Sequence, residues 1–351
     1  MTIRTALSLA VLLWIGAAPH AVCADTPSLS EVFSRVDPAV VEIHVLETDV
    51  PERPGGQPVR VAVLGSGVLI APDGKVLTAA HVVQTADVIE VQFLTGETLK
   101  ATVLSSEESA DTALLQLERP PKAPIVAAFG DSDEVSIGDE VFVIGAPLGV
   151  SHTLTVGHIS GRRRTNATFD GISPTEYFQT DASINHGNSG GPLFNMRGEI
   201  IGIVAGIVST SGGSEGLGFA VTSKVARQIQ QGGWFWSGVD GYLLTGDLAQ
   251  VFNVPPPGTG LLLQRVAGDS PAERLGLRGG TMRATIADED LIVGGDIILE
   301  ILGISLSEPN SGAAIRERLT SLSPGEKVTA TVLRRGRMVT LQTTAIAPQA
   351  P

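Results

Sequence analysis

Residues Gln179 to Leu193 read QTDASINHGNSGGPL, and their centre, Gly187 to Pro192, places Ser189 among glycines. Glycine adopts tight and positive-φ turns readily, so successive backbone N–H groups can converge beside the Ser189 hydroxyl. An acyl-transfer nucleophile needs that arrangement. A Gly/Ser-rich turn alone would be weak support for a catalytic site, so the rest of the chain has to supply the partners of Ser189.

Two segments upstream supply a base and an acid. His81 follows directly on the apolar and small residues of KVLTAA, and Asp111 opens the apolar run TALLQL. A lone histidine at a strand end is usually structural, and a lone aspartate there is usually a turn or cap residue. Together, in the order His, Asp, Ser, they predict a catalytic triad of His81, Asp111 and Ser189. The same order excludes an α/β-hydrolase, in which the serine comes first.

The residues around the triad predict a mainly β fold. From residue 39 to residue 221, about eleven short segments rich in β-branched residues are separated by Gly, Pro and Asp turns, a spacing typical of a sandwich or a pair of barrels. Ser28 followed by Glu31 predicts a capped helix before them, and Thr222 is expected to cap a helix that ends at Gln230.

A second, smaller unit is expected over residues 241–348. Segments 260–266, 297–301, 327–333 and 338–343 read as strands, and residues 271–275 and 312–320 as helices, the first capped by Ser270. The Gly232-Gly233 pair and the shift in composition at Gly238 place the boundary near 232–240.

The N-terminus resembles a signal peptide over residues 1–24. Arg4 precedes an apolar run from Ala6 to about Ala18, and Val22-Cys23-Ala24 supplies the small residues before a cut after Ala24. A membrane anchor is the alternative, but about 13 apolar residues fall short of the roughly 20 that a spanning helix needs. A lipoprotein cysteine is a third possibility, poorly matched by the residues before Cys23. Export with cleavage would leave a mature protein without cysteine or transmembrane anchor.

Composition excludes several classes of protein. The chain has 351 residues, enough for two or three domains, and a net charge of −13 from 24 Lys+Arg and 37 Asp+Glu, with no basic stripe, so nucleic-acid binding is not expected. One cysteine forms no intramolecular disulfide, and the six scattered histidines give no metal-ligand spacing. No metal and no cofactor are expected. ATP-driven unfolding is disfavoured as well, because no P-loop motif occurs.

The chain is similar to the chymotrypsin-like serine proteases, specifically to the HtrA (Deg) family. The matching phrases are GSGVLI, LTAAHVV, ADTALLQL, GDSDEVSIGDEVFVIGAPLG, FQTDASINHGNSGGPL and GLGFAVTS, which lie within about residues 65–223. The resemblance implies a chymotrypsin-like double β-barrel followed by a PDZ-like α+β domain. Its expected bounds are a trypsin-like protease domain at 25–232, a linker at 233–240 and a PDZ domain at 241–348.

The resemblance also implies roles for residues beside the triad. Backbone N–H groups of the Gly187-Asn188-Ser189 loop would form the oxyanion hole. The substrate pocket would be lined by Ser183, Ile184, Val204 and Ala205. Ser183 stands where trypsin has its specificity aspartate, so a small or medium apolar P1 residue is expected rather than Arg or Lys. Asn188 stands where zymogens have an aspartate that pairs with a newly cut N-terminus, which disfavours activation by propeptide cleavage.

For the second unit the resemblance implies peptide binding. Gly241-Tyr242-Leu243-Leu244 is the expected loop for a peptide C-terminus, with a simple packing turn as the equal alternative. The insertion from Arg278 to Val293 would gate the groove or form a solvated loop. The expected function is an exported, periplasmic, ATP-independent endopeptidase that cleaves unfolded or misfolded polypeptides. A chaperone or peptide-binding scaffold is the alternative, and a homotrimer is implied by the family alone.

Overall fold

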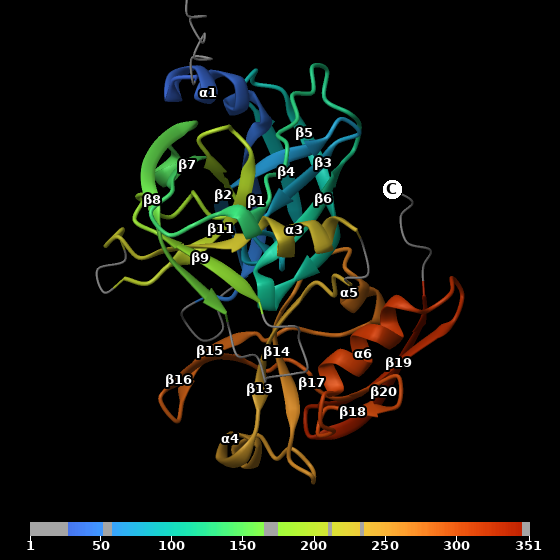
Figure 1. Ribbon diagram of the computed structural model, residues 1–351. Coiled ribbons are helices and arrows are strands. Elements are labelled where there is room, and N and C mark those ends of the chain that lie inside the picture. Colours follow the sequence, from blue (N-terminus) through green and yellow to red (C-terminus); the bar gives the residue numbers. More distant parts are fainter. Residues whose placement is uncertain (1–26, 52–57, 165–174, 210–212, 232–234, 346–351) are drawn as a thin grey trace, which may run out of the picture.

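The computed structural model describes residues 27–51, 58–164, 175–209, 213–231 and 235–345, so the predicted signal peptide lies outside the described residues. Figure 1 shows the β-rich N-terminal part, which contains two barrels, above a smaller unit of strands and helices. Within the described residues, no helix is long and apolar enough to cross a membrane.

The first barrel is a closed antiparallel ring of six strands in the order β1-β2-β3-β6-β5-β4. Closure leaves no strand edge unpaired and makes alternate side chains point inward. In β4, for example, Ile89, Val91 and Phe93 are buried, whereas Glu90 between them is exposed. The strands are β1 (Val40–Asp49), β2 (Val59–Ala71), β3 (Lys75–Thr78), β4 (Val88–Phe93), β5 (Thr98–Glu107) and β6 (Thr112–Leu117), joined among others by α2 (Ala80–Val83) and the 3₁₀ turn η2 (Glu108–Ala110).

The second barrel repeats this plan in the order β10-β11-β12-β9-β8-β7. Its core contains Ile159, Phe178 and Ile201, each at most 1% exposed. Its elements are η3 (Ser132–Glu134), β7 (Glu140–Gly145), η4 (Pro147–Gly149), β8 (Thr153–Arg164), β9 (Glu176–Thr180), β10 (Pro192–Asn195), β11 (Ile200–Ile207) and β12 (Gly218–Thr222).

A third hydrophobic cluster joins the barrels to two helices, α1 (Leu29–Val36) and α3 (Ser223–Gln230). The predicted capping box of α1 is present: Glu31 N donates to Ser28 Oγ and Ser28 N donates to Glu31 Oε2. Thr222 is the N-cap residue of α3 as expected, but its side chain forms no capping hydrogen bond. The 3₁₀ turn η1 (Asp37–Ala39) leads from α1 into β1.

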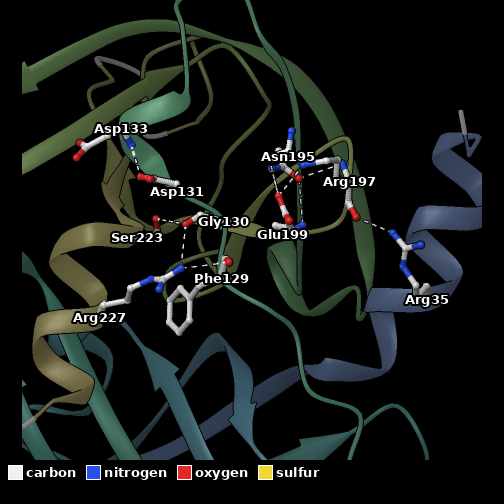
Figure 2. A network of polar contacts seen from close by, with 10 residues as sticks. All are labelled: Arg35, Phe129, Gly130, Asp131, Asp133, Asn195, Arg197, Glu199, Ser223 and Arg227. Atoms are coloured by element: carbon white, nitrogen blue, oxygen red, sulfur yellow. Dashed lines mark hydrogen bonds and ion pairs between the residues drawn. The ribbon is translucent and has the colours of Figure 1, made fainter.

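Figure 2 shows polar contacts that fix both helices to the second barrel. Arg35 of α1 donates to Arg197 O at 2.6 Å, in the turn between β10 and β11. From α3, Ser223 Oγ donates to Gly130 O at 2.9 Å, and the Arg227 guanidinium donates to Phe129 O and lies 5.0 Å from the ring centroid of Phe129. These contacts and the shared apolar cluster hold the two barrels in one unit.

The C-terminal unit is built on one antiparallel sheet in the order β13-β14-β17-β19-β20, with β18 beside β17. Its first strand begins at Val239, so two residues of the predicted linker belong to the domain. Most of the insertion at 278–293 forms the hairpin β15–β16, so it is not an irregular loop, and a gating role stays a prediction. The elements are β13 (Val239–Leu244), α4 (Gly246–Val251), β14 (Gly260–Val266), α5 (Pro271–Leu275), β15 (Met282–Ile286), β16 (Glu289–Val293), β17 (Ile297–Ile301), β18 (Ile304–Ser305), α6 (Ser311–Thr320), β19 (Lys327–Arg334) and β20 (Arg337–Thr344).

This unit docks on the first barrel through polar contacts. Arg265 and Arg283 both pair with Asp49 at the end of β1, at 2.9 and 2.8 Å. Gly268 N donates to Asp87 Oδ1 at 2.9 Å, between α2 and β4. The Arg283 contact comes from the β15–β16 hairpin, so the insertion reaches the neighbouring domain.

Candidate active site

His81 lies in the single turn of α2, directly after β3. The strand ends at Thr78, and Ala79 has extended backbone angles, so the chain enters the turn without a side-chain cap. Ala80, Val82 and Val83 are buried in the first barrel, whereas the His81 side chain is 51% exposed. The apolar residues of the turn thereby anchor it and leave the imidazole accessible to a substrate.

Asp111 follows the 3₁₀ turn η2 and meets His81. Its φ of +43° is in the left-handed region, and its N–H donates to Glu108 O at 3.0 Å. The carboxylate accepts from the His81 backbone N–H at 3.0 Å and lies 2.8 and 2.9 Å from His81 Nδ1 through its two oxygens. Two contacts of the imidazole and one of the His81 backbone therefore hold His81 against one carboxylate.

The pair has the protonation pattern of a base and its orienting acid. An ionised carboxylate only accepts hydrogen bonds, so Nδ1 carries the proton and Nε2 is left with a free lone pair. Burial lowers the pKa of His81, but the hydrogen bond and the charge of Asp111 outweigh it, and the pKa lies above the ordinary 6.5. The imidazolium that forms on proton transfer is thus stabilised by Asp111.

Ser189 lies on the loop before β10, pressed against the first barrel. Ser66 N on β2 donates to Ser189 O at 2.8 Å. Gly190 has φ +82°, and a Cβ on it would lie 2.6 Å from Ala79 N, two residues before His81. Glycine is required there because the loop passes so close to the strand that leads into the His81 turn.

The loop leaves two backbone donors unused. The N–H groups of Gly187, whose φ is +101°, and of Ser189 donate to no acceptor within the described residues. Asn188 N–H, by contrast, donates to Asn185 O at 3.0 Å. The expectation that Asn188 supplies an oxyanion-hole donor is therefore corrected, and the candidate donors are Gly187 and Ser189.

The structure assembles the histidine with the aspartate, but not with the serine. Among the described residues no hydrogen bond joins Ser189 Oγ to His81, although the loop and the turn are in contact through Gly190. His186 exposes its side chain, and its carbonyl accepts from Leu148 N at 2.9 Å. Of His81 and His186, His81 is the one whose imidazole contacts a carboxylate among the described residues.

The four predicted pocket residues do not form one lining. Ile184 and Val204 are 1% and 0% exposed and pack into the core of the second barrel, so their assignment as open pocket walls is corrected. Ser183 is exposed and Ala205 is half-buried. Ile184, in the loop after β9, and Val204, in β11, both turn their side chains into the barrel core.

Gly241 to Leu244 do not form the expected carboxylate-binding loop. They lie in β13, paired with β14 from Gly241 opposite Leu263 to Leu244 opposite Gly260. Leu244 is fully buried in the core of the C-terminal unit. Because β13 is the last strand of its sheet, its other side is an edge.

One structural residue of the site had no sequence signal of its own. Ser66, fully buried on β2, donates through Oγ to Gly187 O at 2.6 Å and accepts from Ala146 N at 3.1 Å. It belongs to the motif GSGVLI, where a serine between glycines could be read only as a turn or strand residue. Its side chain holds the Gly187 peptide from the first barrel.

Comparison with known proteins agrees with this geometry. The trypsin-like peptidase domain family matches residues 65–203. The periplasmic pH-dependent serine endoprotease DegQ of Escherichia coli is 33% identical over 97% of this chain and 77% of its own length. A probable periplasmic serine endoprotease, DegP-like, of Ectopseudomonas mendocina is 35% identical over 91% of this chain and 61% of its own length.

Solved structures give the same relationship. The HtrA-type protease AlgW with a tripeptide superposes with a TM-score of 0.52 at 32% identity, covering 90% of this chain and 96% of that one. AlgW with a decapeptide gives 0.51 at 30% identity, covering 91% and 98%. The sequence identity to these relatives fits the observed double barrel and C-terminal unit. The chain therefore belongs to the HtrA (Deg) family of serine endoproteases.

Proposed function

We propose that this protein hydrolyses peptide bonds through His81, Asp111 and Ser189. The observation that carries the proposal is the His81–Asp111 contact, at 2.8 Å, beside a Ser189 loop whose Gly190 lies against Ala79, the residue before α2. Within the described residues, the N–H groups of Gly187 and Ser189 on this loop have no acceptor. Ser189 Oγ would attack the scissile carbonyl while Nε2 of His81 takes its proton, and His81 would then protonate the leaving amine.

The negative charge of the tetrahedral intermediate would be held by backbone. The N–H groups of Gly187 and Ser189, which have no acceptor in the part of the chain that the structure describes, would be the donors for it, and each such donor contributes about 2.7–4 kcal/mol in other serine proteases. Asp111 keeps the imidazole in the correct tautomer and stays ionised. A water molecule that gives its proton to His81 then attacks the acyl-enzyme, and His81 returns a proton to Ser189 Oγ as the carboxylic acid leaves, so the reaction uses water and groups of this chain.

The substrates we propose are unfolded or misfolded polypeptides in the periplasm, reached by export through cleavage after Ala24. The Escherichia coli relative is named a periplasmic endoprotease and the Ectopseudomonas mendocina relative a probable periplasmic one. The exposed Ser183 offers no counter-ion to an Arg or Lys at P1, so a small or medium apolar P1 residue is preferred. A library of peptide substrates that differ only at P1 measures this preference.

The C-terminal unit is proposed to bind peptide C-termini by strand addition at β13. An edge strand offers unpaired backbone groups to an extended peptide. Leu243, 38% exposed on this strand, is an accessible apolar contact, and Leu243→Lys is expected to weaken binding of an apolar C-terminal peptide. Calorimetric titration with the free acid and the C-terminal amide of one peptide separates carboxylate recognition from strand addition.

The homotrimer implied by the family stays a prediction. Helix α1 could have contributed a contact between copies of the chain, but its apolar residues pack within their own chain. Val32 and Val36 are buried, and Leu29 and Phe33 pack against the same cluster. Sedimentation equilibrium of the mature protein measures the state.

Degradation of denatured casein tests the proposed function. Ser189→Ala should abolish cleavage and leave the circular dichroism spectrum unchanged, while Ser136→Ala, at an exposed serine on the second barrel, should cleave like the wild type. Undiminished cleavage by Ser189→Ala would refute the assignment. Suppressed aggregation without cleavage by the wild type would favour the chaperone alternative.

A further inference from the structure

Gln84 lies next to the His81–Asp111 pair and forms hydrogen bonds to several segments of the chain. It directly follows α2, three residues after His81, and it is 8% exposed. Its backbone N–H donates to Ala80 O at 2.9 Å, which closes the turn that carries His81. Its side chain has a partner for each polar atom, and the partners come from three different segments.

One of these bonds ties the His81 turn to the Asp111 turn, and a second ties it to β5. Gln84 Nε2 donates to Glu108 Oε1 at 2.5 Å, and Ser106 Oγ donates to Gln84 Oε1 at 3.0 Å. Glu108 opens the 3₁₀ turn η2, and its carbonyl accepts the N–H of Asp111. The amide of Gln84 therefore bridges, from the side, the same two turns that the His81–Asp111 contact joins directly.

The remaining bonds come from the C-terminal unit. Gln84 Nε2 also donates to Val239 O of β13 at 3.0 Å, and the indole N–H of Trp236 donates to Gln84 O at 3.1 Å. One amide nitrogen thus contacts both the Asp111 turn and the first strand of the neighbouring domain. A displacement of β13 would remove one of the two acceptors that orient this amide.

We propose that Gln84 is a positioning residue that holds His81 and Asp111 in register, and that it couples their alignment to docking of the C-terminal domain. The proposal rests on the proposed triad. A buried side chain with every polar atom satisfied has one preferred orientation, and removing the Gln84 amide leaves the partly buried acceptors at Glu108 and Val239 without this donor. Catalytic groups tolerate little misplacement, so a loosened pair shows first in the rate of the chemical step.

Gln84→Met tests the positioning role, because methionine keeps the length of the side chain and lacks the donor. We expect kcat to fall about 10- to 100-fold with little change in KM. Gln116→Met is the matched control: Gln116 donates to Asp73 O at 2.9 Å at the opposite end of β6 from Asp111, and its loss should leave kcat unchanged.

The exchange Gln84→Glu with Glu108→Gln supplies the rescue. Residue 108 then donates to residue 84, so the bond between the turns is restored with the net charge unchanged, while the bond to Val239 O is lost. We expect kcat within about threefold of the wild type. Full activity of Gln84→Met, or an exchanged pair as slow as Gln84→Met at equal thermal stability, would overturn the positioning role.

A spectroscopic readout separates this proposal from the triad itself. The downfield proton resonance of His81 Nδ1–H requires only the contact with Asp111 and no turnover. It should be lost or broadened in Gln84→Met and return in the exchanged pair. Full activity of Ser189→Ala would refute the proposed function, but the resonance would still test the positioning role of Gln84. An unchanged resonance in Gln84→Met would overturn that positioning role and leave the proposed function standing.

The coupling is tested by loosening the domain at a distance. Arg283→Gln removes the bonds from the β15–β16 hairpin to Asp49 and Val50, and it touches neither catalytic turn. Introduced into the wild type, Arg283→Gln is expected to lower kcat about two- to fivefold, which corresponds to the free energy of one partly exposed ion pair. Introduced into the exchanged pair, which lacks the bond to Val239 O, it is expected to leave kcat unchanged. An equal fall in both backgrounds, or in neither, would overturn the coupling.

Discussion

The two halves of the site differ in how completely they are built. In the first barrel, His81 and Asp111 share three hydrogen-bond contacts, and Gln84 braces their turns from the side. In the second barrel, the loop of Ser189 is held by Ser66 but makes no hydrogen bond to His81 among the described residues, and two of its N–H groups are unused.

The difference follows from what each half has to do. His81 must already be in the correct tautomer before a substrate binds, so the contacts that fix it are made within the protein. The Ser189 loop must receive a carbonyl, and donors that were satisfied internally would be unavailable to it. One half is therefore closed by its own hydrogen bonds, and the other is left open for the substrate to complete.

The largest effect is expected when either half loses its reacting atom. His81→Ala and Ser189→Ala should each lower kcat by about 10⁶-fold, and the double variant should be no slower than either, because the residues act as a unit. Single-turnover kinetics on a peptide ester measures the three rates. Additive losses would mean that the two halves work independently.

Asp111→Asn should come next, with a fall in kcat of about 10⁴-fold, because the amide favours the wrong imidazole tautomer. KM should change little, since Asp111 does not touch the substrate. The control is Asp73→Asn, an exposed aspartate at the turn before β3. An active Asp111→Asn would show that the closed half is not needed for catalysis.

The open half is probed by Gly187→Ala. A Cβ at φ +101° is strained and would collide with Ala146 O, so the loop would have to move its donor. We expect kcat to fall about 10²- to 10³-fold, the cost of losing an oxyanion-hole donor. Gly96→Ala, at a positive-φ turn with open space around it, controls for backbone strain alone.

The charge state of the closed half sets the acid limb of activity. His81 accepts a proton only when it is neutral, and its pKa is raised above 6.5 by Asp111. The fall of kcat/KM on the acid side should therefore have its midpoint above pH 6.5, and kcat/KM should drop about tenfold for each pH unit below that midpoint. An acid limb below pH 6.5 would contradict the ion-paired state of His81.

The smallest effect concerns Glu108, beside the closed half. Burial of its carboxyl group and the nearby negative charges of Asp240 and Glu107 raise its pKa to about 7. A raised acidic pKa costs stability as pH rises from about 4.5 towards 7 and beyond, because the folded state binds more protons than the unfolded state.

Glu108→Gln should therefore be more stable than the wild type at pH 8, by less than about 1 kcal/mol because the side chain keeps contact with solvent. The gain should be absent at pH 4. Its bond with Gln84 is retained, since the new amide oxygen still accepts. Thermal melts at both pH values measure the difference, and an equal shift at both would contradict the raised pKa.

The sequence was sufficient for the parts of this comparison that depend on local context. His81, Asp111 and Ser189 each have a distinctive neighbourhood, and Ser28 with Glu31 identified the start of α1. The hairpin β15–β16 was missed because its turn residues, Ala287 and Asp288, both have positive φ although the turn contains neither Gly nor Asn, the usual signals of such a turn. Gln84 gave no signal, since its partners are up to 155 residues away.

Side-chain direction and hydrogen-bond occupancy were equally out of reach of the sequence. Ile184 and Val204 were assigned to a pocket by position, yet they face the barrel core. Asn188 was counted as a donor, yet its N–H is used within the loop. Both depend on the tertiary fold, which local patterns do not specify.

Covalent labelling tests the central claim most directly. The full mature chain is treated with a fluorophosphonate, which phosphorylates a hydroxyl only where a base and an oxyanion hole activate it, and the modified residue is located by peptide mass spectrometry. We expect a single adduct on Ser189 that is absent in His81→Ala. An adduct on another residue, or labelling of Ser189 that persists in His81→Ala, would contradict the proposed triad.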